Sequence, residues 1–343
     1  MQVGVLLSGG IDSLYSLLLL KEAGYKVMGI HGLFFDSPQE KKQLDHLRTL
    51  AKQMDFSLQI LNLKKEFETK VIQPFIQSFK QGLTPNPCSL CNPSIKFGLL
   101  LEKARALGCT KLASGHYVNL QEKGLSPLSR GKDRTKDQSY FLALVPRKNF
   151  NYLIFPLGRL EKKQVYAEIK KRELLILTAQ ESNEICFVPA DYRQFLTSRN
   201  ISLGEPGPIK LLDGTLLGTH KGLLNYTIGQ RRGLGIAYKV PLYVLDKDKA
   251  SNTLFVGPKE ELQAQGVIAS KFNFLCPLEK WPQEIWVQIR YRQKPKRTRF
   301  LKQEGSYFYF EFLEPEERPS PGQTLVVYFQ EEVLGGGIIQ GGF

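Results

Sequence analysis

The sequence predicts an α/β protein that begins with a parallel-sheet domain and continues into a small central domain and a C-terminal β-barrel or sandwich. In the first half, short apolar runs alternate with longer helix-forming runs, the order typical of a mostly parallel sheet flanked by helices. After about residue 200 the chain becomes rich in Gly, Pro and Asp-Gly turns. From about Val267 onward, aromatic and alternating runs separated by turns predict the final β domain.

The elements of the first half follow from apolar runs bounded by turns. Strands are expected at Val3–Leu7, Lys26–Phe35, Leu58–Leu63 and Lys111–Ser114, and helices at Leu14–Ala23, Gln39–Met54, Lys65–Gln81 and Ile95–Leu107. Ligands of such sheets bind beyond the carboxyl ends of the strands, so the loops that follow the first and fourth strands are candidate binding loops.

Composition limits the class of protein and its partners. The 343 residues include 47 Lys and Arg against 33 Asp and Glu, a net charge of +14 that indicates a polyanionic partner such as nucleic acid. No stretch approaches the ~20 apolar residues that span a bilayer, so we expect no membrane association. Five cysteines in a chain of this size do not predict a secreted disulfide scaffold, which makes a cytoplasmic location the simplest expectation.

The first candidate binding loop is Ser8-Gly9-Gly10-Ile11-Asp12-Ser13, between a strand and a helix. A helix N-terminus presents unpaired backbone N–H groups, glycines allow close approach and serines add donors, so the loop is suited to phosphate. The common phosphate-loop and dinucleotide-loop patterns are absent. The alternative is a glycine turn in which Ser8 or Asp12 only caps a helix.

Two cysteines form a Cys-x-x-Cys pair, Cys88 and Cys91, expected in a proline-stiffened turn just before the helix at Ile95. Proximity to a helix N-terminus would lower the pKa of such thiols. Cys186 is a third candidate, whereas Cys109 and Cys276 are expected to be buried as small apolar side chains. A structural zinc half-site and a thioredoxin-like redox pair are the alternatives for the Cys-x-x-Cys pair.

A basic segment between Trp286 and Lys302 carries seven Lys or Arg residues and no acidic one. On a strand, Arg290 and Arg292 would share a face beside Tyr291. The arginines could contact phosphates, and the aromatic and guanidinium planes could stack on bases. A solvated edge strand is the alternative. Together with the net charge, the segment favours an RNA-binding surface.

The loop at Ser8 resembles the PP-loop of ATP pyrophosphatases, and nearly the whole chain is similar to the tRNA-specific 2-thiouridylases, the MnmA family. The segments that carry this resemblance are "LLSGGIDS", "TPNPCSLCN" with "IKFG", "ASGHYV", "KDQSYFL", "ESNEICFVPADYRQFL", "NYTIGQRRGLGI" and "SPGQTLVVYFQEEVLGGGII". The resemblance implies a PP-loop domain over residues 1–199, a central domain over 200–262 and a tRNA-binding β-barrel over 263–343.

The resemblance also implies an activity. ATP, with Mg²⁺, would adenylate the 2-oxygen of the wobble uridine in tRNAs of the Lys, Glu and Gln type, and a protein-bound sulfur would displace AMP. The sulfur would come from a cysteine desulfurase, a sulfur-relay protein or sulfide.

The family's site residues map onto this sequence as follows. The ATP site is implied at Leu6, Leu7, Ser8, Gly9, Gly10, Ile11, Asp12, Ser13, Phe35 and Gly115. Cys91 matches the first catalytic cysteine and Cys186 the cysteine that carries the persulfide. The target base and the tRNA would contact Asn86, Pro87, Cys88, His116, Lys136, Asp137, Gln138, Tyr291, Arg292 and Gln323.

One departure concerns Cys88, which stands where many members of the family have an aspartate that could transfer a proton. Its presence leaves the general acid or base unassigned and raises a second hypothesis, that Cys88, Cys91 and Cys186 hold a four-iron iron–sulfur cluster. Two other functions stay open: a PP-loop enzyme that adenylates a small metabolite, and a non-catalytic RNA-binding or sulfur-relay protein.

Overall fold

The N-terminal half is built on a parallel sheet, as the alternating pattern predicted. The computed structural model describes residues 1–174, 186–188 and 191–343. The strands follow the order β3-β2-β1-β4-β7, with bounds β1 (Gln2–Leu6), β2 (Lys26–Leu33), β3 (Ser57–Asn62), β4 (Lys111–Ala113) and β7 (Leu153–Ile154). All four strand pairs are parallel.

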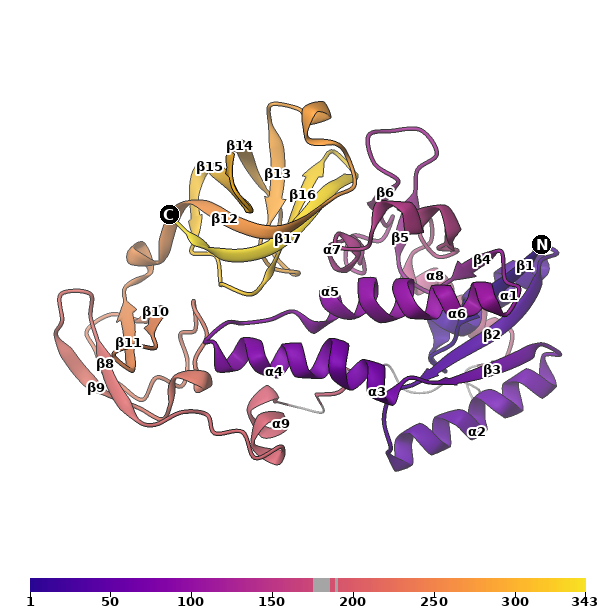
Figure 1. Cartoon of the computed structure of the whole chain (residues 1–343), viewed down its shortest axis with the longest axis horizontal. Coiled ribbons are helices and arrows are strands. Elements are labelled where there is room, and N and C mark those ends of the chain that lie inside the picture. The colour runs from indigo at the N-terminus through magenta and orange to yellow at the C-terminus, as the bar shows by residue number, and fades with distance from the viewer. Residues whose placement is uncertain (175–185, 189–190) are drawn as a thin grey trace.

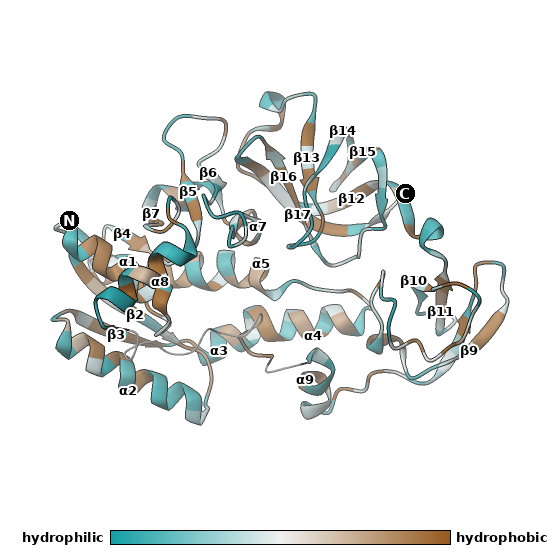
Figure 2. Cartoon of the chain, turned by 180° about the vertical axis from the view of Figure 1, so that it is seen from behind, coloured by the Kyte–Doolittle hydropathy of each residue, from teal (hydrophilic) through white to brown (hydrophobic). Residues whose placement is uncertain are grey.

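Helices cover the sheet and extend beyond it (Figure 1). Four helices of the first half are α1 (Ile11–Glu22), α2 (Pro38–Gln53), α7 (Ser139–Leu142) and α8 (Lys162–Lys171). Figure 2 shows apolar residues along α1 and a largely hydrophilic outer surface on α2. This contrast is expected because seven of the twelve α1 residues are buried, whereas α2 buries three of its sixteen.

Two long helical segments lie side by side and run from the sheet toward the rest of the molecule (Figure 1). One consists of α3 (Lys64–Phe67), the π-helical Glu68–Ile72 and α4 (Gln73–Lys80). The other consists of α5 (Pro87–Cys91), the π-helical Asn92–Leu99 and α6 (Leu100–Ala106). The second begins at Pro87, so the prediction of a helix start at Ile95 was wrong.

The central region contains a four-stranded sheet in the order β10-β11-β8-β9. Its strands are β8 (Gly207–Lys210), β9 (Leu216–His220), β10 (Tyr243–Asp248) and β11 (Thr253–Gly257), and α9 (Tyr192–Ser198) precedes them. A small core of buried residues, including Ile209, Val244 and Leu254, supports this sheet separately from the other cores.

The C-terminal strands form a closed barrel in the order β12-β15-β14-β13-β16-β17, with β12 pairing back to β17. Their bounds are β12 (Gln263–Phe274), β13 (Ile285–Gln288), β14 (Lys296–Glu304), β15 (Tyr307–Glu317), β16 (Thr324–Phe329) and β17 (Glu332–Gly342). The barrel therefore confirms one of the two β architectures that the sequence left open. No described helix is long and apolar enough to cross a membrane.

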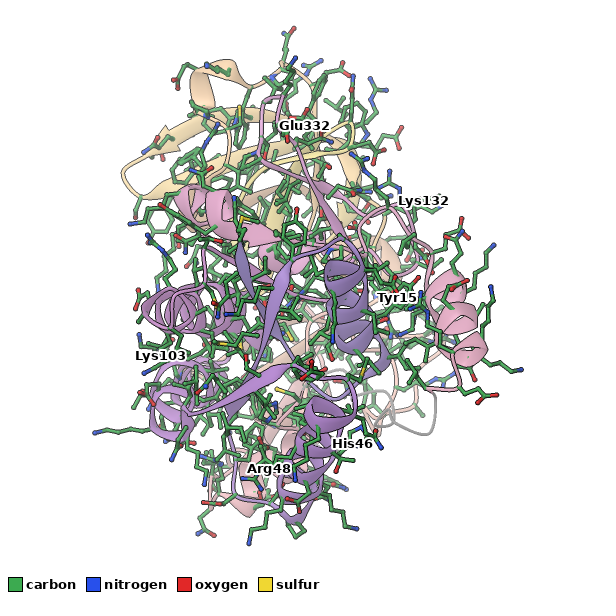
Figure 3. All side chains as sticks on the ribbon, turned by 90° about the vertical axis from the view of Figure 1, so that its right-hand side faces the viewer. Tyr15, His46, Arg48, Lys103, Lys132 and Glu332 are labelled. Atoms are coloured by element: carbon green, nitrogen blue, oxygen red, sulfur yellow. The ribbon has the colours of Figure 1, made fainter. Side chains whose placement is uncertain are left out.

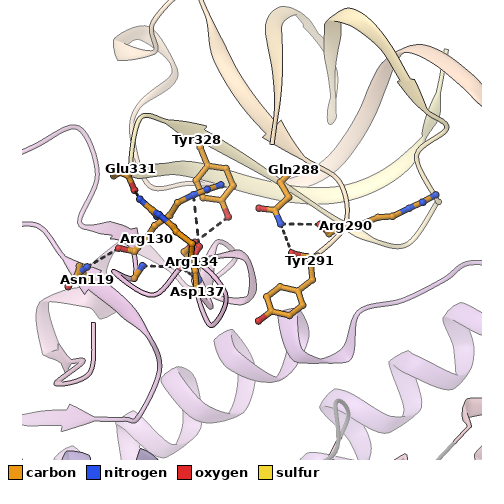
Figure 4. Close-up of polar contacts among 11 residues, drawn as sticks. Asn119, Arg130, Arg134, Asp137, Gln288, Arg290, Tyr291, Tyr328 and Glu331 are labelled. Carbon is orange, nitrogen blue, oxygen red and sulfur yellow. Dashed lines mark hydrogen bonds and ion pairs between the residues drawn. The ribbon is translucent and has the colours of Figure 1, made fainter. Parts of the chain in front are cut away.

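A hairpin of the N-terminal half joins the barrel sheet. It consists of β5 (Val118–Leu120) and β6 (Leu128–Arg130), and Ser129 of β6 pairs with Glu332 of β17. Glu332, labelled in Figure 3, also accepts a hydrogen bond from the Ser126 backbone N–H at 2.9 Å. The guanidinium of Arg130 lies 3.9 Å from the centroid of the Tyr328 ring. Figure 4 shows Arg130 and Tyr328 beside Arg134 and Glu331, which form an ion pair.

Candidate active site

The glycine-rich loop leaves the carboxyl end of β1 and enters α1, as expected for a phosphate-binding loop. Gly9 has a φ of +74°, a left-handed conformation that favours glycine. Ser13 Oγ donates to the Gly10 carbonyl at 2.9 Å and accepts from the Ser8 N–H at 3.2 Å. These bonds fix the loop around the N-terminus of a twelve-residue helix, where unpaired N–H groups and the helix dipole favour an anion.

The loop after β4 packs directly against the glycine-rich loop. A Cβ added to Gly115 would lie 2.8 Å from the Asp12 carbonyl carbon and 3.0 Å from its Cβ, so only glycine fits there. Phe35, the expected adenine contact, follows β2 and packs edge-on against Phe67 with centroids 5.3 Å apart. The structure thus brings Gly115 to the loop and places Phe35 beyond the neighbouring strand of the sheet.

Asp12 is held by two groups that the sequence did not indicate. Lys162 Nζ lies 2.9 and 2.8 Å from its two carboxylate oxygens, and the Tyr117 hydroxyl donates to Oδ1 at 2.7 Å. Lys162 stands 150 residues away, in a segment without a recognisable motif, so only the fold could reveal it. Its ammonium is suited to neutralise phosphate charge beside the loop.

The Asp12–Lys162 pair also tests the fit of Mg²⁺. Magnesium prefers carboxylate oxygens, but both oxygens of Asp12 already accept hydrogen bonds. Within residues 1–174, 186–188 and 191–343, no group of three or more His, Cys, Asp or Glu residues is arranged to hold a metal ion. The protein therefore offers no ready metal site at the loop, and we derive no step through Mg²⁺.

The Cys-x-x-Cys pair lies inside α5, not in a turn before a helix as predicted. Asn86 is the N-cap residue: its Oδ1 accepts from the backbone N–H groups of Cys88 and Ser89 at 3.1 and 3.4 Å. Pro87 occupies the first helical position, which proline favours because its missing N–H would be unpaired anyway. Both thiols are thus fixed on the first turns of one helix.

Cys186 is brought to the same region by the residue that follows it. Phe187 is buried and packs edge-on against Phe67, Phe75 and Phe195, with centroids 5.8, 5.2 and 5.2 Å apart. Phe187 and Cys91 belong to one continuous core. The Cys186 side chain itself is exposed, so it lies at the surface of this core beside the helix that bears Cys91.

Burial, not helix position, controls ionisation of the thiols. Burial raises the pKa of Cys91 to about 12, and surrounding protein raises the pKa of Cys186 to about 11 although its side chain reaches solvent. The pKa of Cys88 is raised by burial as well. The expectation of lowered pKa values was therefore wrong, because desolvation outweighs the short helix N-terminus.

The same electrostatic interactions link the thiols to one another and to Lys96. Negative charge on Cys186 or Cys88 would raise the pKa of Cys91 further, and the positive charge of Lys96 lowers the pKa of all three thiols. In an α-helix, residues five apart point about 140° from each other. The π-helical segment Asn92–Leu99 reduces that angle, which places Lys96 on the face of Cys91. Lys96 lies in the segment "IKFG" but was not among the site residues expected from the sequence.

The three thiols do not form a preformed cluster site. Cys88, Cys91 and Cys186 are among the described residues, and within these residues no group of three or more His, Cys, Asp or Glu side chains is arranged to hold a metal ion. The residues as arranged do not fit an iron–sulfur cluster.

His116 follows β4 and packs against the helical segment that bears Lys96. Its Nδ1 is 2.8 Å from Ser114 Oγ, and its ring packs edge-on against Phe97 and Phe155. Burial and the charge of Lys96 hold the pKa of His116 well below its usual value, so the imidazole is neutral at physiological pH.

Three of the other residues expected to contact tRNA differ in exposure and in the hydrogen bonds that they make within the protein. Lys136 is exposed. Asp137 is occupied by hydrogen bonds from the Gly131 and Ser139 N–H groups at 3.0 and 3.1 Å. Gln138 accepts from the Tyr117 N–H at 3.1 Å. Of these side chains, that of Lys136 is the most accessible to a large partner.

The barrel residues occupy a turn, not a strand. β13 ends at Gln288, so the prediction that Arg290 and Arg292 share one face of a strand was wrong. The side chain of Gln288 donates to the carbonyls of Arg290 and Tyr291 at 3.0 and 2.6 Å (Figure 4). The Tyr291 ring packs on Phe141, with centroids 4.3 Å apart, which places the turn against the N-terminal half.

Cys109 and Cys276 are confirmed as buried apolar residues, with 4% and 0% of their surfaces exposed.

Comparison with known proteins covers the chain from end to end. Family models match residues 1–190 (tRNA methyl transferase HUP domain), 193–258 (tRNA methyl transferase PRC-barrel domain) and 264–339 (aminomethyltransferase beta-barrel domain). The chain is 44% identical over 345 residues to the tRNA-specific 2-thiouridylase MnmA of Nitratidesulfovibrio vulgaris strain DP4, with 99% of both chains covered. It is 40% identical over 358 residues to that of Persephonella marina, with 99% of this chain and 100% of the relative covered.

The chain belongs to the MnmA family of tRNA-specific 2-thiouridylases. Solved structures are more distant: a U34-tRNA thiolase NcsA from Methanococcus maripaludis with its 4Fe-4S cluster is 19% identical, with a TM-score of 0.39, 58% of this chain and 65% of that chain covered. A 4-thiouridine synthetase–RNA complex with bound ATP is 16% identical, with a TM-score of 0.36, 55% of this chain and 46% of that chain covered. Similarity at this level supports no argument about the chemistry of this MnmA-family chain.

Proposed function

We propose that the chain is an ATP-dependent tRNA sulfurtransferase that forms 2-thiouridine at the wobble position. The observation that supports the proposal is that the N-terminal half of one chain bears both a phosphate-binding loop and three thiols that all interact electrostatically with Lys96. Methyl transfer, which the family-model descriptions mention, requires neither feature. An enzyme that adenylates a small metabolite would require only the loop.

The first step uses the glycine-rich loop. The uridine 2-oxygen attacks the α-phosphorus of ATP and pyrophosphate leaves, so the oxygen becomes part of an AMP leaving group. Backbone N–H groups at the N-terminus of α1 and the ammonium of Lys162 would hold the phosphates and stabilise charge that develops on them.

The second step uses two thiols, with Cys186 carrying the transferable sulfur as a persulfide. The Cys91 thiolate attacks the Cys186 sulfur, the S–S electron pair passes to the terminal sulfur, and that sulfur attacks C2 as AMP departs. The two thiol protons leave to solvent, and a small-molecule or protein thiol reductant then reduces the Cys91–Cys186 disulfide. Lys96 would stabilise the thiolate that begins this step.

Thiolation of a tRNA transcript tests the proposal, with ATP, a persulfide-level sulfur donor (a cysteine desulfurase with L-cysteine) and either the wild-type protein or Cys186→Ala. We expect the variant to release pyrophosphate in the presence of tRNA but to form no 2-thiouridine. Retained thiolation would overturn the assigned sulfur chemistry, and loss of tRNA-dependent pyrophosphate release in the wild type would overturn the function itself.

The iron–sulfur hypothesis is tested on protein purified without oxygen. Iron-free, colourless protein with full activity would exclude a cluster, whereas stoichiometric iron and sulfide would show that the thiols rearrange to bind one. Cys88→Asp, which restores the residue of many family members, separates the two routes: it keeps activity in the persulfide route and loses iron in the other.

The remaining assignments complete the proposal. We place the domain boundaries at 1–199, 200–262 and 263–343 and the enzyme in the cytoplasm, with a cysteine desulfurase, a relay protein or sulfide as sulfur donor. The tRNA and its target base would contact residues of the N-terminal half and of the barrel, namely Asn86, Pro87, Cys88, His116, Lys136, Asp137, Gln138, Tyr291, Arg292 and Gln323. Phe35 and Gly115 would contact the nucleotide.

A further inference from the structure

The segment that leads into the thiol-bearing helix is held by the barrel, not by its own half of the molecule. The Thr84 N–H donates to the Pro321 carbonyl at 2.8 Å, and Gln323 Nε2 donates to the Thr84 carbonyl at 2.8 Å. Gly322 has a φ of +91°, and a Cβ there would lie 2.9 Å from the Leu83 Cβ. The loop before β16 therefore fits closely against residues 83–84.

Tyr140 extends this connection to the helix itself. It is 1% exposed, and its hydroxyl donates to the Thr324 carbonyl of β16 at 2.7 Å. The Asn86 side chain acts on the same hydroxyl and opposes the rise in its pKa that burial causes. Tyr140 belongs to α7, which packs against α5, and the neighbouring Phe141 carbonyl accepts from Asn92 Nδ2 at 3.0 Å.

The Asn86 amide completes the connection. Its Oδ1 caps the helix by accepting from the N–H groups of Cys88 and Ser89. Barrel strand β16 is thus connected through Tyr140 and its helix α7 to the first turn of the helix that bears Cys88 and Cys91.

We propose that Tyr140 is a positioning residue that ties the first turn of the thiol helix to the barrel, so that the access of Cys91 to a reaction partner depends on barrel contacts. This inference rests on the proposed function only where it assigns the thiols to sulfur transfer. The contacts between the barrel and the thiol helix are those of the protein without ATP or tRNA.

The test is Tyr140→Phe, with Tyr328→Phe as the matched control. Tyr328 is also 1% exposed, and its hydroxyl lies 3.2 Å from Ser139 Oγ at the same junction. Each variant loses one buried hydroxyl. They are compared for iodoacetamide labelling of each cysteine without ATP or tRNA, and Cys109 and Cys276 in the same samples serve as internal references.

Loss of one hydrogen bond should increase the population in which the first helical turn is open by about fivefold. We therefore expect Cys91 to be labelled about fivefold faster in Tyr140→Phe and at the wild-type rate in Tyr328→Phe. In thiolation assays, kcat should fall in Tyr140→Phe while KM for tRNA is unchanged. Equal labelling of Cys91 in both variants, or a change in KM alone, would overturn the inference.

Gln323→Ala gives a second measurement at a partly exposed position, should Tyr140→Phe fold poorly. It removes the donor to Thr84, and it should also accelerate labelling of Cys91 in free protein. Because tRNA is absent, any role of Gln323 in RNA binding does not affect this rate. An unchanged rate of Cys91 labelling would contradict the inference that the barrel fixes residues 83–84 and the helix that follows them. Failure of the proposed function would be seen separately, as wild-type protein that does not thiolate tRNA.

Discussion

Replacement of Lys96 by methionine tests whether burial and a single lysine together set the reactivity of the thiols. With a pKa of about 12, only about 1 in 10,000 Cys91 side chains is a thiolate at pH 8, against about a quarter of ordinary thiols. The thiolate fraction of Cys91 is therefore ~2,000-fold lower than that of an ordinary thiol. Because thiolates of higher pKa are more nucleophilic, a gain of about 40-fold in intrinsic reactivity partly offsets this deficit. Cys91 in the wild type should therefore react about 50-fold more slowly than an unfolded thiol, before steric protection.

The assay measures modification of each cysteine by a small disulfide reagent between pH 7 and 10, followed by mass spectrometry of the peptides. For Cys91 the rate should rise about tenfold per pH unit without a plateau, because the whole range lies below its pKa. In Lys96→Met the rates at Cys88, Cys91 and Cys186 should all fall, because Lys96 lowers the pKa of each.

Lys103→Met is the control, since Lys103 lies on α6 of the same helical segment and at the periphery of the molecule (Figure 3). It should leave the three rates unchanged. A plateau for Cys91 below pH 9, or identical profiles in Lys96→Met and wild type, would refute the reasoning.

Three further outcomes are expected. Lys162→Met should raise KM for ATP about tenfold, because a charge-assisted contact beside the loop is lost. Arg292→Ala should weaken tRNA binding and reduce the salt dependence by about one unit of slope, because this exposed guanidinium would contact a phosphate. Burial raises the pKa of Tyr140 and Tyr328, so folding stability should be complete below about pH 10 and fall at higher pH, measured as the urea midpoint.

Each of these outcomes has a control. Lys163→Met, at the neighbouring exposed position, should not alter KM for ATP, and an equal effect of both lysine variants would contradict the role of Lys162. Arg297→Ala removes a barrel arginine that is paired with Glu284. If it weakened tRNA binding as much as Arg292→Ala, a general effect of charge would explain the result. A urea midpoint that did not fall above pH 10 would show that the two tyrosines do not limit alkaline stability.

Much of the first half could be predicted because the signals are local. The strand at Val3, the glycine loop and the following helix lie within about twenty consecutive residues, and each depends on near neighbours. The start of the thiol helix was missed although Asn86 and Pro87 form a common N-cap and first-position pair, because the same residues are also typical of turns.

The rest depends on contacts that join distant segments. Lys162 meets Asp12 across 150 residues, and Tyr140 meets Thr324 across 184. Neither pair leaves a pattern in one sequence. The direction of the thiol pKa values was missed for a related reason: a helix N-terminus is visible in the sequence, whereas the burial that opposes it is a property of the whole core.

The shared sheet at β6 and β17 has a consequence for any attempt to divide this protein. A fragment that ended before residue 263 would expose the β6 edge that now pairs with β17, together with the face of Tyr140 that the barrel covers. Unpaired strand edges recruit other chains. Such a fragment should aggregate during expression, so the barrel cannot be exchanged as an independent module among enzymes of this kind.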